Sequence, residues 1–346
     1  MSPPDTLRVM TWNILYDTSP VGGGSGVERW PLVLEGVRQA SPDLLAMQEV
    51  LPGRIAALPH DLPEYRLAAS EPGGTDRAIA PLLAVAAAAL VLLVLRRRRH
   101  RDPTIVRGPL RRRFGHLITA VLWLIVLGIP AALAYGSWYL GGYGTLNEQL
   151  AFAYRPERLR LVETRTYWFS PTPTKPGTRD PFSFEPRIAQ LGVFTLEPGG
   201  ETLTVVNVHP GHSPSADASI AELLRGVLDR RWNGAPQILL GDFNATHDRE
   251  RLSLLRETRT TGEPPFRDAW LEAPERVGSP GTFNWAKTSP GTLRIDHVLV
   301  RGPLRTLSAE TIAVARDKLI ASDHSAVVVD LVRTDTMSTP PPPPEP

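Results

Sequence analysis

The stretch 237–244 reads QILLGDFN, an apolar run that ends in a glycine and two polar side chains, Asp242 and Asn244. A short apolar run bounded by turn residues predicts a buried strand, with the polar groups on the rim of a sheet. A lone Asn or Asp there is usually a turn residue or a helix cap. Five further apolar runs border on polar side chains in the same way, at Asn13, Glu49, His209, Asp296 and Asp323-His324. So many coincidences favour one shared site.

The rest of the chain alternates many short strands with few helices. Turns such as PGG at 198–200 join consecutive strands, which favours antiparallel pairing. This order predicts an α+β fold, in which two antiparallel-rich sheets pack face to face and helices lie outside. Strands are predicted over 7–14, 43–48, 150–154, 159–169, 188–196, 202–209, 237–240, 294–300 and 326–331, and helices over 28–39 and 216–231.

Composition excludes several classes of site. The chain has no cysteine, so a disulfide framework, a thiolate zinc site and a cysteine nucleophile are all excluded. The formal net charge of +2 conceals an asymmetry, because residues 96–116 hold nine arginines against a single acid, Asp102. The rest of the chain is therefore net acidic and lacks the basic footprint of a general nucleic-acid-binding surface.

Two uncharged apolar runs, 79–95 and 117–140, flank the arginine-rich loop 96–116. A helix that spans a bilayer needs roughly 17 to 25 apolar residues, so these runs predict two transmembrane helices inserted in a loop. A pair of buried core helices is the alternative interpretation. The predicted organisation is a folded domain built from 1–78 and 141–335, the inserted hairpin 79–140 and a proline-rich disordered tail, 336–346.

The arginines also predict an orientation. Short arginine-rich loops stay on the cytoplasmic side of a membrane. A two-span protein of the cell membrane with its folded domain outside the cytoplasm is therefore expected.

The polar residues of the strand ends indicate a type of chemistry. Carboxylates and amides without cysteine are hard oxygen ligands, which suit Mg²⁺ or Mn²⁺ better than zinc. Histidines paired with acids suit proton transfer. Together they predict hydrolysis at phosphorus, in which a divalent cation offsets the phosphoryl charge and an imidazole activates water.

The strings that carry these residues resemble the motifs of the endonuclease/exonuclease/phosphatase superfamily, which includes DNase I-like nucleases and bacterial sphingomyelinases. They are TWNI at 11–14, QEV at 48–50, NVHP at 207–210, GDFN at 241–244, RIDHVLV at 294–300 and SDH at 322–324. They follow the family order, and the resemblance covers the chain except the hairpin and the tail. It implies a four-layer αββα sandwich of the DNase I type and a metal-dependent phosphoesterase.

The resemblance also implies residue roles. Glu49 would be the principal metal ligand, assisted by Asn13 and Asp323. His324 would be the general base, oriented by Asp296.

Two more roles follow from the GDFN string. Asp242 would position the attacking water, and Asn244 would contact the scissile phosphate as a catalytic and substrate-binding residue. Either Asp242 or His324 could take the proton of the water, and the sequence leaves both alternatives open.

A second acid and histidine pair is suggested by Glu148 and His209. DNase I-like nucleases carry a glutamate eight residues before the proline of a strand-Arg-Pro string, and Glu148 to Pro156 has that spacing. His209 would stabilise the leaving oxygen; the alternative is that Glu148 only caps a strand edge. Arg187 and Tyr154 are the further candidates for substrate contact. The remaining histidines are expected to take no part: His60, His100, His116, His212, His247 and His297.

The position of the hairpin suggests the substrate. Only seven residues separate the second apolar run from Glu148, a reach of at most roughly 25 Å. A membrane-borne phosphoester, either a lipid head group or a polyprenyl phosphate, is therefore the favoured substrate, and the bilayer is the expected partner. A membrane-tethered nuclease and a non-catalytic membrane scaffold are the rival hypotheses, and the sequence implies no obligate protein partner.

Overall fold

The computed structural model describes residues 6–17, 19, 23–72, 85–94, 117–129, 148–180, 183, 186–258, 262–284 and 291–334. The chain divides into two compact units, one formed by residues 1–73 and 145–346 and the other by residues 74–144. The predicted arginine-rich loop 96–116 and the predicted tail 336–346 lie outside the described residues.

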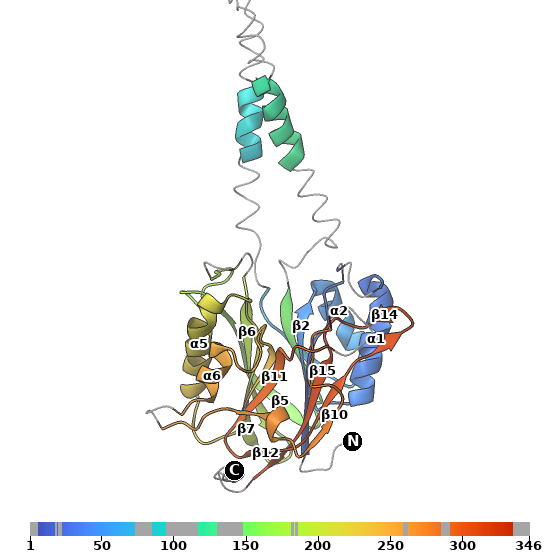
Figure 1. The fold of residues 1–346 in the computed structure, drawn as a ribbon, viewed down its shortest axis with the longest axis vertical. Helices are drawn as coiled ribbons and strands as arrows, with labels where there is room; N and C mark the ends of the chain where they lie inside the picture. The colour runs from blue at the N-terminus through green and yellow to red at the C-terminus, as the bar shows by residue number, and fades with distance from the viewer. Residues whose placement is uncertain are drawn as a thin grey trace, which may run out of the picture. The chain divides into compact units, whose positions relative to one another are not determined.

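Two large β-sheets form the first unit (Figure 1). Its strands are β1 (Thr6–Asn13), β2 (Leu44–Val50), β3 (Arg66–Ala69), β4 (Gln149–Tyr154), β5 (Leu159–Trp168), β6 (Ile188–Leu196), β7 (Glu201–His209), β8 (Gln237–Asp242), β9 (Arg267–Asp268), β10 (Glu275–Val277), β11 (Asp296–Arg301), β12 (Leu304–Ile312), β13 (Ala315–Arg316), β14 (Leu319–Ile320) and β15 (Ala326–Arg333). One sheet has the order β10-β12-β15-β1-β2-β4-β3 and the other β5-β6-β7-β8-β11-β9, while β13 and β14 form a small ribbon. Most neighbours pair antiparallel, as predicted, and β1–β2, β7–β8 and β10–β12 pair parallel.

The alternation of side chains along the strands explains how the layers stack. In β1, Val9 belongs to the core between the two sheets, whereas Met10 belongs to the core beneath α1 (Gly26–Ala40). Successive residues of a strand point to opposite faces, so one strand supplies both cores. Phe152 of one sheet and Leu240 of the other meet in the central core.

Helices cover the outer face of each sheet. The first sheet is covered by α1 and α2 (Pro52–Asp61), and the second by α5 (Asp217–Asp229) and α6 (Glu250–Arg256). The short η2 (Pro214–Ala216) and α7 (Ala269–Glu272) complete the helices of this unit. Helix α1 begins with a capping box, in which Ser25 and Glu28 satisfy each other's backbone N–H groups. The predicted four-layer αββα sandwich is thus confirmed.

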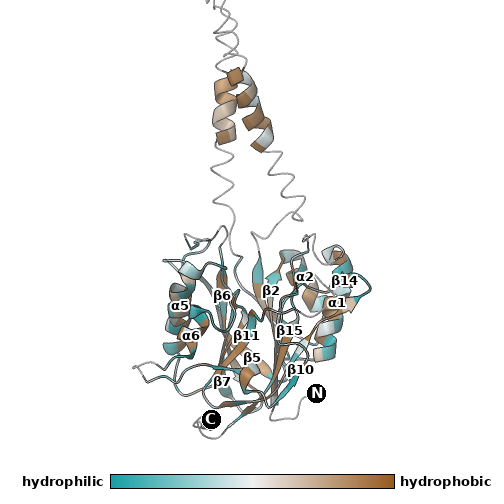
Figure 2. Ribbon diagram, in the orientation of Figure 1, coloured by the Kyte–Doolittle hydropathy of each residue, from teal (hydrophilic) through white to brown (hydrophobic). Residues whose placement is uncertain are grey.

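The second unit contains helical residues 85–94 and 117–129, which Figure 2 colours mainly as hydrophobic. Among the described residues, no helix is long and apolar enough to cross a membrane. At a rise of about 1.5 Å per residue, the helical segment 85–94 covers only about half of a hydrocarbon core of about 30 Å. The prediction of two complete spans is therefore not supported, and residues 79–84, 95 and 130–140 of those spans lie outside the described residues.

The second unit is inserted between two neighbouring strands. Strand β3 pairs antiparallel with β4, so the chain leaves the sheet and returns to it at the same edge. Ser70 ties the two ends together, because its hydroxyl accepts from Leu150 N at 3.0 Å and its carbonyl accepts from Gln149 Nε2 at 2.6 Å. Glu148, directly before β4, therefore lies at the point of insertion.

Candidate active site

The ends of several strands meet around one cavity of about 500 Å³. These strands come from both sheets, so side chains far apart in the sequence converge there. The cavity is lined by Glu49, Arg187, His209, His212, Asp242, Asn244, Ala245, Thr246, Arg249, Phe283, Leu293, Ile295, Asp323 and His324. Six of these residues border strands that the sequence predicts, so residues expected to share one site do converge on one cavity: Glu49, His209, Asp242, Asn244, Asp323 and His324.

The floor of the cavity consists of Asn13, Glu49, Asp242, Asp296 and Asp323. Asn13 joins the two sheets there. Its Nδ2 donates to Glu49 Oε1 at 2.9 Å and to Asp242 Oδ2 at 3.1 Å, while its Oδ1 accepts from Leu15 N at 3.1 Å. Glu49 Oε2 accepts from Tyr16 N at 3.1 Å. The Glu49 backbone has φ +61°, at an irregularity in the pairing of β2 with β4. A non-glycine residue in this left-handed region costs free energy, and such residues gather at functional sites.

The floor brings together four carboxyl groups, which fits the binding of a divalent ion: Glu49, Asp242, Asp296 and Asp323. Burial, and next the charge of Asp323, raises the pKa of Glu49 to about 6. Burial also raises the pKa of Asp242 to about 6. Oδ1 of Asp323 and Oδ1 of Asp296 are buried and have no hydrogen-bond partner among the described residues. Carboxylate oxygens in this state are suitable donors for Mg²⁺ or Mn²⁺.

A buried histidine faces this acidic floor. His324 Nδ1 donates to Asp296 Oδ2 at 2.8 Å, which leaves Nε2 directed toward Asp242 Oδ2 at 3.8 Å. The backbone places this group firmly, since Trp12 Nε1 donates to the His324 carbonyl at 2.9 Å. The carboxylates of Asp296 and Asp242 outweigh burial and raise the pKa of His324 well above its usual value. The predicted partnership of His324 with Asp296 therefore has the required geometry.

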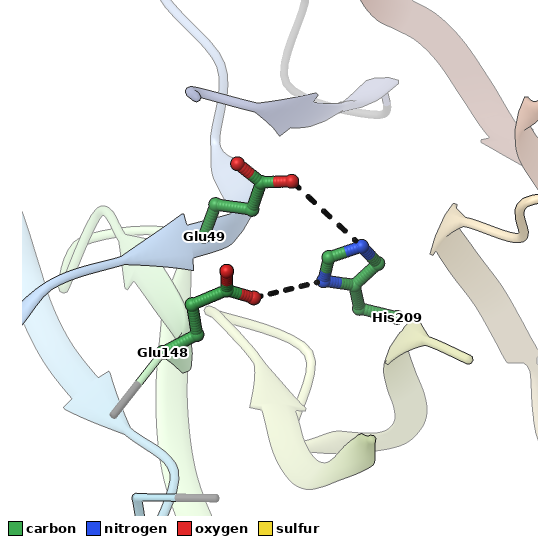
Figure 3. A group of neighbouring side chains, drawn as sticks. All are labelled: Glu49, Glu148 and His209. Atoms are coloured by element: carbon green, nitrogen blue, oxygen red, sulfur yellow. Dashed lines mark ion pairs between the residues drawn. The ribbon is translucent and has the colours of Figure 1, made fainter. Parts of the chain in front are cut away.

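A second histidine lies between the acids of the other side (Figure 3). His209 Nδ1 lies 3.6 Å from Glu148 Oε2, and Nε2 lies 3.9 Å from Glu49 Oε1. Its Nε2 also lies 3.5 Å from Asp242 Oδ2 and 2.8 Å from Arg187 Nη1. Burial and the charge of Arg187 lower the pKa of His209 well below its usual value. A neutral imidazole here can donate a single hydrogen bond to a leaving oxygen.

The GDFN turn brings Asn244 over the floor. Asn244 N donates to Asp242 Oδ1 at 2.8 Å, and Asn244 Nδ2 donates to Pro210 O at 3.0 Å. Gly241 makes this turn possible, because its φ is +144° and a Cβ there would lie 2.2 Å from the carbonyl oxygen of Val208. Only glycine adopts this conformation without strain.

Two expectations about individual residues are corrected by the structure. Tyr154 ends β4 whereas Glu148 precedes it, so roughly 20 Å of extended strand separates them. Tyr154 packs edge-on against Phe194, at 5.3 Å between ring centroids, and does not line the cavity. His212, expected to take no part, does line it, three residues after His209.

Arg249 is a cavity residue that sequence reasoning missed. It stands in an unremarkable polar segment, THDRE, and no motif distinguishes it from the other surface arginines. Its place seven residues after Asp242, on the same loop, was the only available indication.

Solved structures with the same architecture include several phosphoesterase-family proteins. A functionally unknown conserved protein from Enterococcus faecalis superposes with a TM-score of 0.65 at 20% identity, over 94% of this chain and 100% of the other. A mannosyl-6-phosphatase from Bacteroides thetaiotaomicron gives a TM-score of 0.64 at 20% identity, over 94% and 99%. Truncated TDP2 from Caenorhabditis elegans gives 0.56 at 15% identity, over 94% and 97%. At such low identity these likenesses establish the fold alone.

A search of curated protein sequences gave no match. A scan against protein families matches residues 10–324, a range that begins within β1 and ends at His324. The matched range includes every residue of the floor described above. The chain therefore belongs to the endonuclease/exonuclease/phosphatase family, whose members hydrolyse phosphoester bonds with the help of a divalent metal.

Proposed function

We propose that this protein hydrolyses a phosphoester by direct attack of water, with Mg²⁺ or Mn²⁺ bound at Glu49, Asn13 and Asp323. The observation that carries the proposal is the buried pair of His324 and Asp296, 2.8 Å apart, beside the acidic floor. The bound cation would offset the charge of the phosphoryl oxygens. Asn13 would have to turn its amide so that Oδ1 faces the ion, because Nδ2 now faces the acids.

The residues of the cavity suit the proton movements of such a reaction. Asp242 or His324 takes a proton as water oxygen bonds to phosphorus, and the ester P–O bond breaks on the opposite side. Asn244 and Arg187 hold the phosphoryl oxygens in place. His209, kept neutral by burial and by the charge of Arg187 and oriented by Glu148, donates a hydrogen bond to the leaving oxygen.

A membrane-borne substrate is the second part of the proposal. The inserted unit joins the catalytic unit next to Glu148, and both of its described helices expose large apolar side chains such as Leu124, Leu127 and Val91. One wall of the cavity is also apolar, formed by Phe283, Leu293 and Ile295. These features support a lipid or polyprenyl phosphate, held near a bilayer by the insertion.

The test uses full-length protein in detergent with Mg²⁺. Hydrolysis of a phospholipid or polyprenyl phosphate is expected, and Glu49→Gln and His324→Gln should each abolish it. Glu35→Gln, on the exposed outer face of α1, is the matched control. Mannose 6-phosphate belongs in the same panel, since one structural neighbour is a mannosyl-6-phosphatase. Turnover of DNA or a sugar phosphate with every lipid untouched would refute the lipid substrate.

A membrane-tethered nuclease is the second candidate, favoured by the 3.6 Å approach of Glu148 to His209. A plasmid-nicking assay separates the two, because a nuclease converts supercoiled DNA to open circles. Tight Mg²⁺ binding without turnover of any phosphoester would instead favour a non-catalytic membrane scaffold.

The proposed location is the cell membrane, with the catalytic unit outside the cytoplasm. The chain has no cysteine, so Val277→Cys, on an exposed strand, gives a single thiol. An impermeant thiol reagent should label it in intact cells. Labelling only after lysis would place the catalytic unit inside.

A further inference from the structure

One wall of the cavity carries an arginine and a histidine although the floor is acidic. His212 lies three residues beyond His209 on the loop after β7, and Arg249 lies seven residues beyond Asp242 on the loop after β8. Arg249 Nη2 donates to the backbone carbonyl oxygen of His212 at 3.5 Å, so the two residues lie next to each other in the cavity wall. The mechanism proposed above uses neither of them.

Arg249 is held in place by a buried cluster. Asp217, which is 2% exposed, accepts from Arg249 Nε and Arg249 Nη2, both at 2.9 Å. Asp217 also accepts from Arg251 Nε at 2.5 Å. Two guanidinium groups share one carboxylate, so the cluster keeps a net positive charge.

The two arginines of the cluster face different surroundings. Arg251 is fully buried, and its Nη1 donates to Gly211 O at 2.9 Å and Phe243 O at 2.7 Å. Arg249 lines the cavity, and its Nη1 makes no hydrogen bond among the described residues. The net positive charge is therefore presented to the cavity by Arg249.

Positively charged groups also surround His212. Burial lowers the pKa of its imidazole, and the nearby charges of Arg187, Arg251, His324 and Arg249 lower it further. The acids of the floor instead raise one another's pKa, as Asp323 does for Glu49. The cavity thus has an acidic floor suited to a cation and a cationic wall suited to an anion.

We propose that His212 and Arg249 form an anion subsite, which binds a second phosphoryl group of the substrate beside the one held over the floor. This rests on the proposed function and narrows it to phosphoesters that carry two phosphoryl groups, such as a diphosphate. The apolar wall at Phe283, Leu293 and Ile295 accommodates the organic part. A single phosphoryl group held over the floor would leave Arg249 paired with Asp217 alone.

Binding of two non-hydrolysable probes tests the subsite directly. Full-length protein in saturating Mg²⁺ is titrated calorimetrically with methylenediphosphonate and with methylphosphonate. Arg249→Gln and His212→Asn should each weaken the diphosphonate roughly tenfold, the usual loss for a hydrogen bond to a charged group. Methylphosphonate binding should change less than about twofold, because one phosphonate fills only the floor.

Two further variants control for charge and folding. Arg249→Lys should keep most of the affinity for the diphosphonate, since the positive charge remains. Arg316→Gln removes an exposed arginine paired with Glu35 on the outer face and should change neither probe. His212→Asn leaves the Asp217 cluster intact, so it tests the subsite even if Arg249→Gln unfolds.

The possible results separate the subsite from the reaction. Equal losses for the two probes in Arg249→Gln and His212→Asn, or no loss for either, overturn the subsite. Selective loss of the diphosphonate without turnover of any phosphoester supports the subsite and refutes the proposed reaction. Turnover of lipid phosphates with unchanged diphosphonate binding in both variants supports the reaction and refutes the subsite.

Discussion

Metal binding should weaken strongly as the pH falls from 7 to 5. Burial, with the nearby charge of Asp323, raises the pKa of Glu49 to about 6, and burial raises that of Asp242 to about 6. A divalent ion binds the carboxylate and not the carboxylic acid, so protons compete with the metal below pH 6. Asp242 lies next to Glu49, since Asn13 donates to both carboxylates.

The size of the effect follows from these pKa values. Competition by the Glu49 proton, with a pKa of about 6, weakens binding about tenfold between pH 7 and pH 5. A glutamate with its ordinary pKa of 4.5 would lower the affinity less than about twofold over the same range. A tenfold loss of metal affinity would therefore show that burial raises the pKa of Glu49.

Isothermal titration with Mn²⁺ at pH 5, 6 and 7 measures this directly, and buffers of different ionisation enthalpy count the protons released. Glu49→Gln should abolish tight Mn²⁺ binding and reduce the number of protons released by one. Glu35→Gln, which alters an exposed acid, should change neither the affinity nor the number of protons released. An affinity that varies less than about threefold between pH 7 and pH 5 would refute the reasoning.

Three further results are expected. Asp296→Asn should lower kcat by about 10²- to 10⁴-fold without loss of metal binding, because it disturbs the orientation and basicity of His324; an unchanged pH–rate profile would argue against this pairing. Gly241→Ala should cost at least about 3 kcal/mol in denaturant unfolding, since a Cβ would lie 2.2 Å from a backbone oxygen of β7, and a loss below about 1 kcal/mol would contradict it. Arg251→Met should cost about 3 to 5 kcal/mol by the same assay, because it leaves the Asp217 carboxylate buried with one partner fewer; near-neutral stability would show that the cluster tolerates the loss.

The floor of the site was predictable because its residues border apolar strands. Asp242 and Asp296 each border an apolar run, and those runs pair in the sheet with Asp296 directly opposite Asp242. Strand ends thus carried the information that brings both acids to one rim. The same rule argues against Tyr154, because Glu148 and Tyr154 flank opposite ends of one strand and a rim holds only one of them.

The cationic wall was not predictable in this way. His212 and Arg249 stand in irregular loops whose direction depends on the Asp217 cluster and not on periodicity. Asp217 is at the start of α5, more than thirty residues from Arg249, so only the packing of α5 against α6 brings them together. Sequence patterns identify the ends of strands, whereas contacts between distant loops require the folded chain.

The acidic floor also makes the metal-free protein sensitive to pH. Folded Glu49, with its pKa raised to about 6, keeps a proton that the unfolded chain releases near pH 4.5, so folding stability falls as the pH rises through this window. The resulting loss of folding free energy is about 2 kcal/mol, and it is complete above about pH 6.

The difference in unfolding free energy between wild type and Glu49→Gln isolates this contribution, because other titrating groups are common to both proteins. Without metal, the difference should move by about 2 kcal/mol in favour of the variant between pH 4.5 and pH 7. Saturating Mg²⁺ should reverse the order at pH 7, because only the wild type retains the carboxylate that binds it. Glu49 and Asp242 belong to different sheets, so the hydrogen bonds that Asn13 donates to both acids join the two sheets at this rim. If metal left the order of stability unchanged at pH 7, the ion would have to bind elsewhere, and the floor would be stabilised by its hydrogen bonds alone.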